Sequence, residues 1–173
     1  MGPVSPTRAV MARWSAFPLR LMVGAGFMIH GYLKLGRGVD VFAAALAGLG
    51  IAAPGLMAWL TVATELIAGA AVLVGVRVAL VTFPMIIVLL VAMIEVHWQF
   101  GFSSIKFLAV TVDGPQFGKP GVECDLLYLA AISALLMLPP DPWSFDHWRG
   151  GDALAPRNPV TRGRCECFRP PLA

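Results

Sequence analysis

Residues 55–98 read GLMAWLTVATELIAGAAVLVGVRVALVTFPMIIVLLVAMIEVHW. Two apolar runs make up this stretch, residues 55–75 and residues 78–98, and a short turn containing Arg77 separates them. A helix rises about 1.5 Å per residue, so roughly 20 mostly apolar residues are needed to cross a ~30 Å hydrocarbon core. Each run has that length, and the stretch therefore predicts two consecutive transmembrane helices.

Two further apolar runs lie on either side of this pair, at residues 17–35 and 122–138. Prolines, glycines or charged residues bound all four runs, as expected at the ends of helices. The sequence therefore predicts an all-α fold. Its body would be a four-helix transmembrane bundle of up-down topology, contained in one membrane domain at residues 17–146.

Two connections between the runs are long enough to have structure of their own. Residues 39–51 are rich in Ala and Leu but too few to cross, which predicts a short interfacial helix on the outer face. Residues 99–121 mix aromatic and aliphatic side chains with Gly and Pro and show no helical pattern. Such a loop either carries function or lies as an apolar segment on the rim of the bundle.

The composition supports a membrane protein and excludes several other classes. Apolar residues make up 58% of the chain and charged residues 13%, whereas a soluble domain carries roughly 25% charge. The mean hydropathy is +0.76. The net charge is only +3 and no basic face is interleaved with aromatics, which argues against nucleic-acid binding. The expected environment is the lipid bilayer.

The distribution of Lys and Arg predicts the orientation. With four spans both termini lie on the same side, and the side richer in these residues is cytoplasmic. Nine cationic residues fall on the terminal side and four on the opposite side. The nine are Arg8, Arg13, Arg20, Arg77, Arg149, Arg157, Arg162, Arg164 and Arg169, and the four are Lys34, Arg37, Lys106 and Lys119. We therefore expect a multi-pass protein of the cell (inner) membrane with cytoplasmic N- and C-termini.

The two ends of the chain are polar. Residues 1–16 form a basic N-terminal segment, and residues 147–173 form a tail rich in Arg and Pro that we expect to be disordered. The run at residues 17–35 follows arginines as a signal peptide would. It continues without a close small-x-small cleavage site and three further spans follow, so we predict an uncleaved first helix.

The cysteines do not indicate a metal site or a disulfide framework. Cys124 stands alone, and Cys165 and Cys167 form a C-x-C pair in the tail, which is not a complete zinc spacing. Ordinary thiols are the simplest interpretation. The heme motif C-x-x-C-H, the Rossmann glycine fingerprint and the P-loop are absent from the sequence.

Glu65 is the polar residue most difficult to explain as structural. It lies near the middle of the second run, where an ionisable side chain costs about 2.5–3.5 kcal/mol on insertion scales. Its neighbours at three and four residues, Thr61, Ala68 and Gly69, are small and would let another helix approach closely. We therefore expect Glu65 to face the interior of the bundle.

Polar residues of the other runs gather toward the outer end. His30 lies on the face of Gly26 and Lys34 in the first run, the third run ends with charged groups, and the fourth begins with them, including Asp125. The inner half of the bundle is nearly bare by comparison. We predict one outward-opening polar site. Its proton-handling residues would be Glu65, His30 and Lys34, and its cofactor-binding residues would be His97, Glu123 and Glu95.

Each of these residues also has a structural interpretation. Lys34 could extend to the outer headgroups, and His30 could be a hydrogen-bonded packing residue. The charged groups at the ends of the third and fourth runs could be solvated helix ends. Glu95 and His97 point to nearly opposite sides of a regular helix, at about 100° per residue, so at most one of them faces the site.

Such a cluster suits more than one kind of chemistry. Burial and a neighbouring cation act in opposite directions on the protonation of a carboxylate, so the group and its partner could exchange protons with a lipid-soluble quinone. His and carboxylate side chains from facing helices are also usual metal ligands, although the paired Glu-x-x-His pattern of di-iron bundles is absent. The residues alone predict a site and leave its chemistry open.

Five short motifs follow one another along residues 17–146. They are Arg20-Leu21 with Gly24, Phe27, His30-Gly31 and Lys34-Leu35; Glu65-Leu66 with Gly69 and Leu73-Val74-Gly75; His97; Glu123 with Leu126-Leu127-Tyr128; and Trp143-Ser144-Phe145-Asp146. In this order and spacing the motifs resemble the DoxX family of small four-helix membrane proteins. The closing segment departs from the Gly-Pro-Gly usual in that family, since Pro139-Pro140-Asp141-Pro142 stands there, and this departure bears on the subfamily.

The resemblance implies a cell-membrane protein related to subunits of quinone-linked sulfur oxidoreductases and to partners in membrane redox complexes. One hypothesis is thus a membrane subunit of a quinone-linked oxidoreductase, active only within its complex, with a quinone as the cofactor. The alternative is a non-catalytic membrane scaffold or assembly partner of a redox or export complex, acting through the aromatic outer loop and the Arg-rich tail. A homo-oligomer is compatible with either hypothesis.

Overall fold

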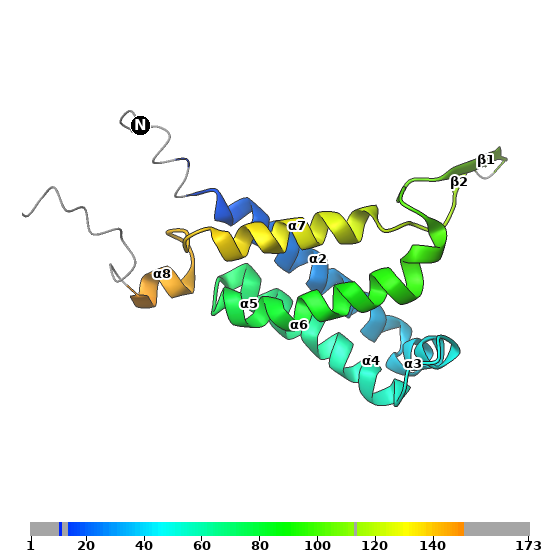
Figure 1. The fold of residues 1–173 in the computed structure, drawn as a ribbon, viewed down its shortest axis with the longest axis horizontal. Helices are drawn as coiled ribbons and strands as arrows, with labels where there is room; N and C mark the ends of the chain where they lie inside the picture. Colours follow the sequence, from blue (N-terminus) through cyan, green and yellow to red (C-terminus); the bar gives the residue numbers. More distant parts are fainter. Residues whose placement is uncertain (1–10, 12–13, 113, 151–173) are drawn as a thin grey trace, which may run out of the picture.

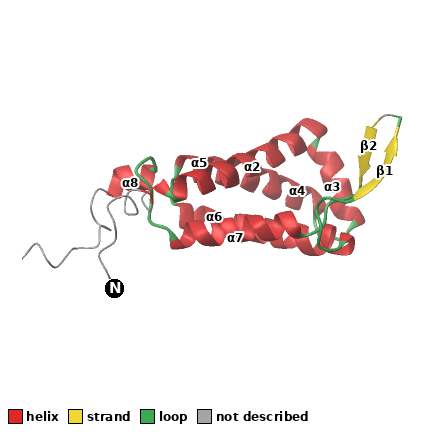
Figure 2. Cartoon of the chain, turned by 90° about the horizontal axis from the view of Figure 1, so that it is seen from above, coloured by secondary structure: helices red, strands yellow, loops and turns green. Residues whose placement is uncertain are grey.

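The computed structural model describes residues 11, 14–112 and 114–150. Four long helical segments run side by side, and a short helix, α3, lies at one end (Figure 1). A β-hairpin projects from that same end, and Figure 2 shows it standing clear of the helices. The N-terminal segment up to residue 10, residues 12–13 and the tail from residue 151 lie outside the described residues, and so do the predictions made for them.

The first helical segment is α2 (Ala16–Arg37). Gly38, with a φ of 96°, caps its C-terminus and connects it to α3 (Val39–Gly48). The second is built from three consecutive parts, α4 (Pro54–Ala63), the π-helical turn η1 (Thr64–Ala68) and α5 (Gly69–Val74). Proline in the first turn of α4 is favourable because the N–H it lacks would have no partner there. The expected short helix at residues 39–51 thus corresponds to α3.

The third segment follows a tight turn at Gly75, whose φ is 78°. It comprises α6 (Val78–Val91), a second π-helical turn η2 (Ala92–His97) and the 3₁₀ turn η3 (Trp98–Phe100). The fourth is α7 (Glu123–Met137), and the short helix α8 (Phe145–Gly150) follows it. The helical bounds lie within a few residues of those expected from the apolar runs.

Two of these segments have the length and apolarity to cross a membrane. They are Pro54–Val74, with a mean hydropathy of 1.8, and Val78–Phe100, with 2.6. Only 33% of the most apolar part of the first and 17% of that of the second are buried, as expected for helices with side chains facing lipid. Neither α2 nor the 15-residue α7 meets the same criteria of length and apolarity. Membrane crossing by α2 and α7, and the cytoplasmic position of the termini, remain predictions.

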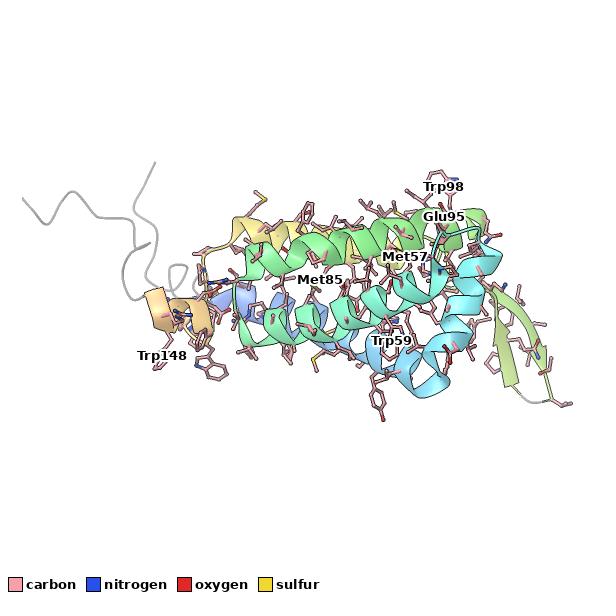
Figure 3. All side chains as sticks on the ribbon, turned by 90° about the horizontal axis from the view of Figure 1, so that it is seen from below. Met57, Trp59, Met85, Glu95, Trp98 and Trp148 are labelled. Carbon is pink, nitrogen blue, oxygen red and sulfur yellow. The ribbon has the colours of Figure 1, made fainter. Side chains whose placement is uncertain are left out.

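Figure 3 shows the side chains along these segments, with Trp98 and Trp148 at opposite ends and Met85 between the helices. The main core lies where α2, α5, α6 and α7 meet, around Met85. Tryptophan favours the two membrane interfaces, so this spacing fits a chain whose long axis crosses the bilayer. The core residues are Ala16, Val23, Phe27, Ala68, Val72, Met85, Leu89, Ile132 and Leu135.

The hairpin corrects the prediction of an all-α fold. Residues 99–121 were expected to be an irregular loop, but β1 (Phe107–Thr111) and β2 (Gly114–Phe117) pair as antiparallel strands within them. The β-branched and aromatic residues of β1 favour a strand, and Gly114, with a φ of 112°, takes a turn conformation that other residues rarely adopt. From the sequence, the apolar side chains of residues 99–121 predicted only a functional loop or a segment on the rim of the bundle.

Two glycines bring α2 and α5 into backbone contact. A Cβ at Gly24 would lie 2.8 Å from the carbonyl oxygen of Gly69, and a Cβ at Gly69 would lie 3.0 Å from that of Gly24. Backbone cannot move aside as a flexible side chain can. Small residues at such crossings let membrane helices pack closely, so these positions set the distance between the first and second segments.

We expect Gly24→Ala to destabilise the protein by about 1–3 kcal/mol, since the added methyl group overpacks the contact with Gly69. The matched control is Gly36→Ala in the same helix, where a Cβ would meet nothing within 4 Å. Equilibrium unfolding in mixed detergent micelles measures both variants. Equal stabilities of the two variants would show that α2 and α5 do not approach each other in this way.

Candidate functional site

The centre of the candidate site is an ion pair between Lys34 and Glu65. Lys34 lies in the last turn of α2, and its ammonium contacts Oε1 of Glu65 in η1. Glu65 is buried, with 5% of its surface exposed, and the side chain of Lys34 is about one-quarter exposed. The prediction that Glu65 faces the interior and meets a basic group is thus what the structure shows.

The local backbone explains how the two side chains meet. Gly31 lies one turn before Lys34, and a Cβ there would approach Cγ of Leu66 to 2.9 Å and Cβ of Glu65 to 3.0 Å. The absence of a side chain at Gly31 therefore lets α2 lie directly on η1. A π-helical turn shifts the side chains that follow it out of the regular α-helical order, and such turns are frequent at functional sites. Both π-helical turns found among the described residues carry candidate residues, Glu65 in η1 and Glu95 with His97 in η2.

The pair is bordered by an aromatic ring next to Lys34, and one carboxylate oxygen of Glu65 lacks a hydrogen-bond donor. The Lys34 ammonium lies 5.1 Å from the centre of the Phe42 ring in α3, a cation–π distance. The second carboxylate oxygen of Glu65, Oε2, is buried and accepts no hydrogen bond from any described residue. A buried acceptor without a donor is costly and calls for an explanation, of which a functional role is one.

A cavity of about 490 Å³ lies between α3, α4 and the third helical segment. Neither Lys34 nor Glu65 lines it, but two residues next to the pair do. Phe42, which stacks under Lys34, and Thr64, which precedes Glu65, both line it. The remaining lining is mostly aliphatic, with Thr61 and Glu95 as further polar groups. This size and this mixture of apolar wall and few polar groups suit a small ring compound of low polarity. The apolar lining residues are Leu46, Ile51, Met57, Leu60, Pro84, Ile87, Val88 and Val91.

A second polar pair lies at the same end of the helices. Nδ1 of His97 is 2.6 Å from Oδ2 of Asp125, which is buried in the first turn of α7. Glu123 accepts a hydrogen bond from the backbone N–H of Ser104 at 2.9 Å. Glu123 therefore fixes the start of the loop that leads to the hairpin, and this contact gives it a structural role.

Four of the six predicted site residues are not brought to the ion pair: His97 and Glu123 make the contacts just described, and the other two are exposed. His30 is exposed on α2, and Glu95 is exposed at the edge of the cavity. The α-helical spacing had placed His30 and Lys34 on one face, but Lys34 reaches inward through its long side chain while the shorter imidazole stays outside. Across the described residues, His, Cys, Asp and Glu nowhere form a group of three that could hold a metal ion.

The opposite end of the helices holds a buried network that corrects the expectation of a bare inner half. Arg20 is 3% exposed and pairs through Nη1 with Asp141, which is fully buried. Its Nε donates to the carbonyl oxygen of Val72 at 3.0 Å, and its Nη2 donates to that of Leu73 at 2.8 Å. Arg20 thus satisfies carbonyls at the C-terminus of α5, where helices leave such groups unpaired.

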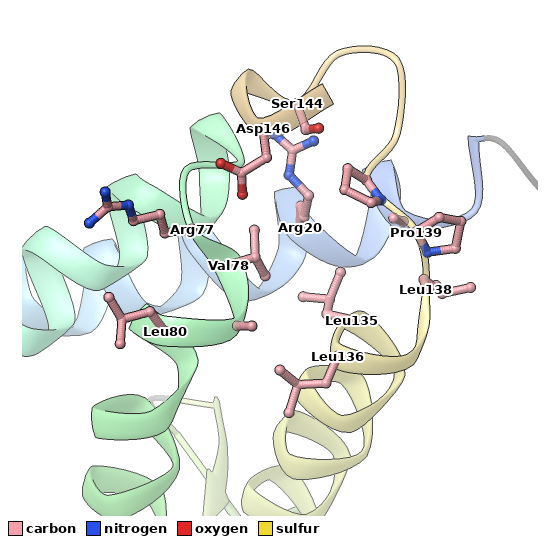
Figure 4. Close-up of a pocket in the computed structure, with 13 residues that line it drawn as sticks. Arg20, Arg77, Val78, Leu80, Leu135, Leu136, Leu138, Pro139, Ser144 and Asp146 are labelled. Carbon is pink, nitrogen blue, oxygen red and sulfur yellow. The ribbon is translucent and has the colours of Figure 1, made fainter. Parts of the chain in front are cut away.

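The network also fixes the segment after α7. A Cβ at Gly75 would lie 2.6 Å from Cβ of Ser144 and 2.7 Å from Cζ of Arg20, so glycine is needed there. The backbone N–H of Asp146 donates to the carbonyl oxygen of Gly75 at 3.0 Å. Figure 4 shows Arg20, Ser144 and Asp146 among the residues that line a cavity of about 400 Å³, with Arg77 on another part of its wall. This site is structural in character.

The sequence gives little indication that Arg20, Asp141 and Asp125 are buried and paired. Arg20 was counted as a cytoplasmic charge, although it follows Pro18 inside an apolar run, and Asp141 stands between prolines where a loop was expected. Asp125 was noted as a helix-end charge, but its burial and its pairing with His97 were not foreseen. Each is paired with a residue more than 25 positions away, so no local pattern reveals it.

Comparison with known proteins gives one match. The family model described as DoxX matches residues 15–98. Residues 15–98 therefore carry a DoxX domain. The DoxX region therefore includes α2, α3, η1 and η2, and with them the Lys34–Glu65 pair and the cavity beside it. The suspected family is confirmed, and with the two apolar segments it identifies an integral membrane protein. No curated protein and no solved structure matches the chain.

Proposed function

We propose that this protein is the membrane subunit of a quinone-linked oxidoreductase complex, in which Lys34 and Glu65 hold and transfer a proton. The observation that carries the proposal is the buried carboxylate of Glu65, which has one oxygen on Lys34 and the other without a donor. An ion pair that served only for packing would be expected to satisfy both oxygens.

The cavity beside the pair fits the ring of a lipid-soluble quinone, because its walls are apolar and its polar groups are few. When bound, a quinone supplies two-electron chemistry that is coupled to protons. The residues of this chain would orient the ring and exclude water. Thr61 and Thr64 offer hydroxyl groups along the wall, and Glu65, which follows Thr64 in the chain, would with Lys34 give or accept a proton.

The remaining site residues take lesser roles in the proposal. His97 with Asp125 would serve as a second protonatable pair nearer the end of the helices, where His97 is partly exposed. Glu95 would stand at the mouth of the cavity. His30, which is exposed, would take part only through a neighbouring subunit. The site would open on the outer side of the membrane, with both termini cytoplasmic.

Glu65→Gln tests the proposal, because it keeps the shape of the side chain and removes the proton exchange. We expect the quinone-reductase activity that the intact gene restores to membranes of a deletion strain to fall by about 100-fold, a usual loss when a general acid–base group is removed. The matched control is Asp40→Asn, an exposed carboxylate on α3. Immunodetection in washed membranes checks that all variants insert equally. Full activity of Glu65→Gln would instead favour the non-catalytic scaffold.

A further inference from the structure

The β-hairpin exposes a set of large apolar side chains that no part of the described chain covers. We call this set the hairpin patch. Every member has more than half of its surface exposed, and Val112 at the tip is fully exposed. Exposed apolar residues on the helices are explained by contact with lipid, but those on the hairpin need a separate explanation. The patch consists of Ile105, Phe107, Leu108, Val110, Val112 and Phe117.

One face of the hairpin carries most of the apolar side chains of its strands. The register pairs Phe107 with Phe117 and Val110 with Pro115, so these four residues share a face, and a bulge interrupts the alternation at Leu108. The centres of the Phe107 and Phe117 rings are 6.3 Å apart, yet both side chains remain exposed. An isolated two-stranded hairpin is at best marginally stable in water. A hairpin with a bare apolar face is therefore expected to be completed by a further surface.

Lipid is a poor candidate for that surface. The sheet has two strands, so each strand leaves one edge of backbone N–H and C=O groups unpaired among the described residues. Open sheet edges do not occur in the hydrocarbon region, because nothing there satisfies such groups. The hairpin also projects beyond the ends of the helices, as Figures 1 and 2 show.

Charge at the base of the hairpin argues for a partner different from a second copy. Lys106 and Lys119 flank the strands, and their ammonium groups lie 5.9 and 5.1 Å from the centre of the Phe100 ring. Neither forms an ion pair within the part of the chain that the structure describes. A second copy would bring the same two lysines, whereas a surface with carboxylates would pair with them.

We propose that the hairpin is the docking site of a water-soluble protein domain that adds a strand to its edge and places acidic side chains against Lys106 and Lys119. Backbone hydrogen bonds would supply affinity, and the patch would supply specificity, as in other cases of strand addition. The edge used is that of β1, since Pro115 removes one N–H donor from β2. The proposal uses no residue of the Lys34–Glu65 pair and goes beyond the proposed function.

The test is the rate at which a cysteine in the patch reacts with a water-soluble maleimide. Cys124, Cys165 and Cys167 are first replaced by serine in the full chain, and Val110→Cys is then introduced. The control is Asp40→Cys, an exposed position on α3 at the same end of the molecule. Both proteins are expressed at native level and labelled in isolated native membranes and, after purification, in lipid nanodiscs.

We expect Val110→Cys to react about tenfold more slowly in native membranes than in nanodiscs, as for a site that a partner occupies most of the time. Asp40→Cys should react equally in both. Adding Lys106→Glu and Lys119→Glu should restore fast labelling of Val110→Cys in native membranes.

Three results would overturn the proposal. Slow labelling in nanodiscs that contain only lipid would show that the bilayer covers the patch. A disulfide-linked dimer of Val110→Cys would show that a second copy does. Equally fast labelling in membranes and nanodiscs would show that nothing does.

Discussion

Arg20→Met is expected to lower the free energy of unfolding by about 3–5 kcal/mol, the range for removing one partner of a buried ion pair. The substitution leaves the fully buried carboxylate of Asp141 without its cation. It also leaves the carbonyl oxygens of Val72 and Leu73 without the side-chain donor that each now has. Both losses fall on the junction of α2, α5 and the segment after α7.

Equilibrium unfolding in mixed micelles, followed by tryptophan fluorescence, measures this loss. The control is Arg77→Met, which removes an exposed arginine at the same end of the helices and should change stability by less than about 0.5 kcal/mol. Arg20→Lys should fall between them, because an ammonium group cannot reproduce the planar fork of the guanidinium. Indistinguishable stabilities of Arg20→Met and Arg77→Met would contradict the network.

Lys34→Met is expected to cost about 2–4 kcal/mol, since it leaves the carboxylate of Glu65 buried without a cation. The expected loss is smaller than that for Arg20→Met because the side chain of Lys34 is partly exposed and therefore partly solvated. Glu65→Gln should cost less, because the freed ammonium of Lys34 can extend toward the interface.

The double variant Lys34→Met with Glu65→Leu separates structure from function. Replacing a buried ion pair with apolar side chains of similar volume is often neutral or stabilising. We therefore expect the double variant to regain the stability that Lys34→Met loses, as measured by the same unfolding experiment. The quinone-reductase activity in membranes should remain lost. Recovery of activity together with stability would show that the pair serves only the fold.

The helical segments could be predicted from the sequence because their signal is local. The apolar runs at residues 55–75 and 78–98 have the length and composition that the bilayer demands, and the structure ends its helices close to the same bounds. The inward position of Glu65 was also predictable. Its small neighbours imply a close helix, and an unpaired carboxylate facing lipid is too costly to be expected.

Helical spacing shows which residues share a face of a helix, but it does not show which side chains form ion pairs. His30 and Lys34 share a helical face, but only the longer side chain reaches Glu65, and helical spacing does not show this difference. The Arg20–Asp141 and His97–Asp125 pairs join segments far apart in sequence. The charges of Arg20 and Asp125 looked like ordinary helix ends, because their burial depends on neighbours that the sequence does not place.

The hairpin was missed for a different reason. The apolar side chains of β1 are not alternated with polar ones, so the period-2 pattern of a half-buried strand is absent. The exposed apolar side chains of this hairpin form the proposed docking surface. The turn at Gly114 was a usable signal, since a short Gly-containing connection between β-branched and aromatic residues indicates a hairpin.

The most direct test of the account is the distance between the Nζ atom of Lys34 and the Cδ atom of Glu65 in a lipid bilayer. Solid-state NMR measures it through the dipolar coupling of ¹⁵N-labelled lysine to ¹³C-labelled glutamate. The chain has two other lysines, Lys106 and Lys119, and Glu65→Gln assigns the signal by its loss. The account predicts a separation of about 4 Å or less, as for a direct ion pair. A separation beyond about 6 Å, outside the range of direct charge pairing, would contradict it.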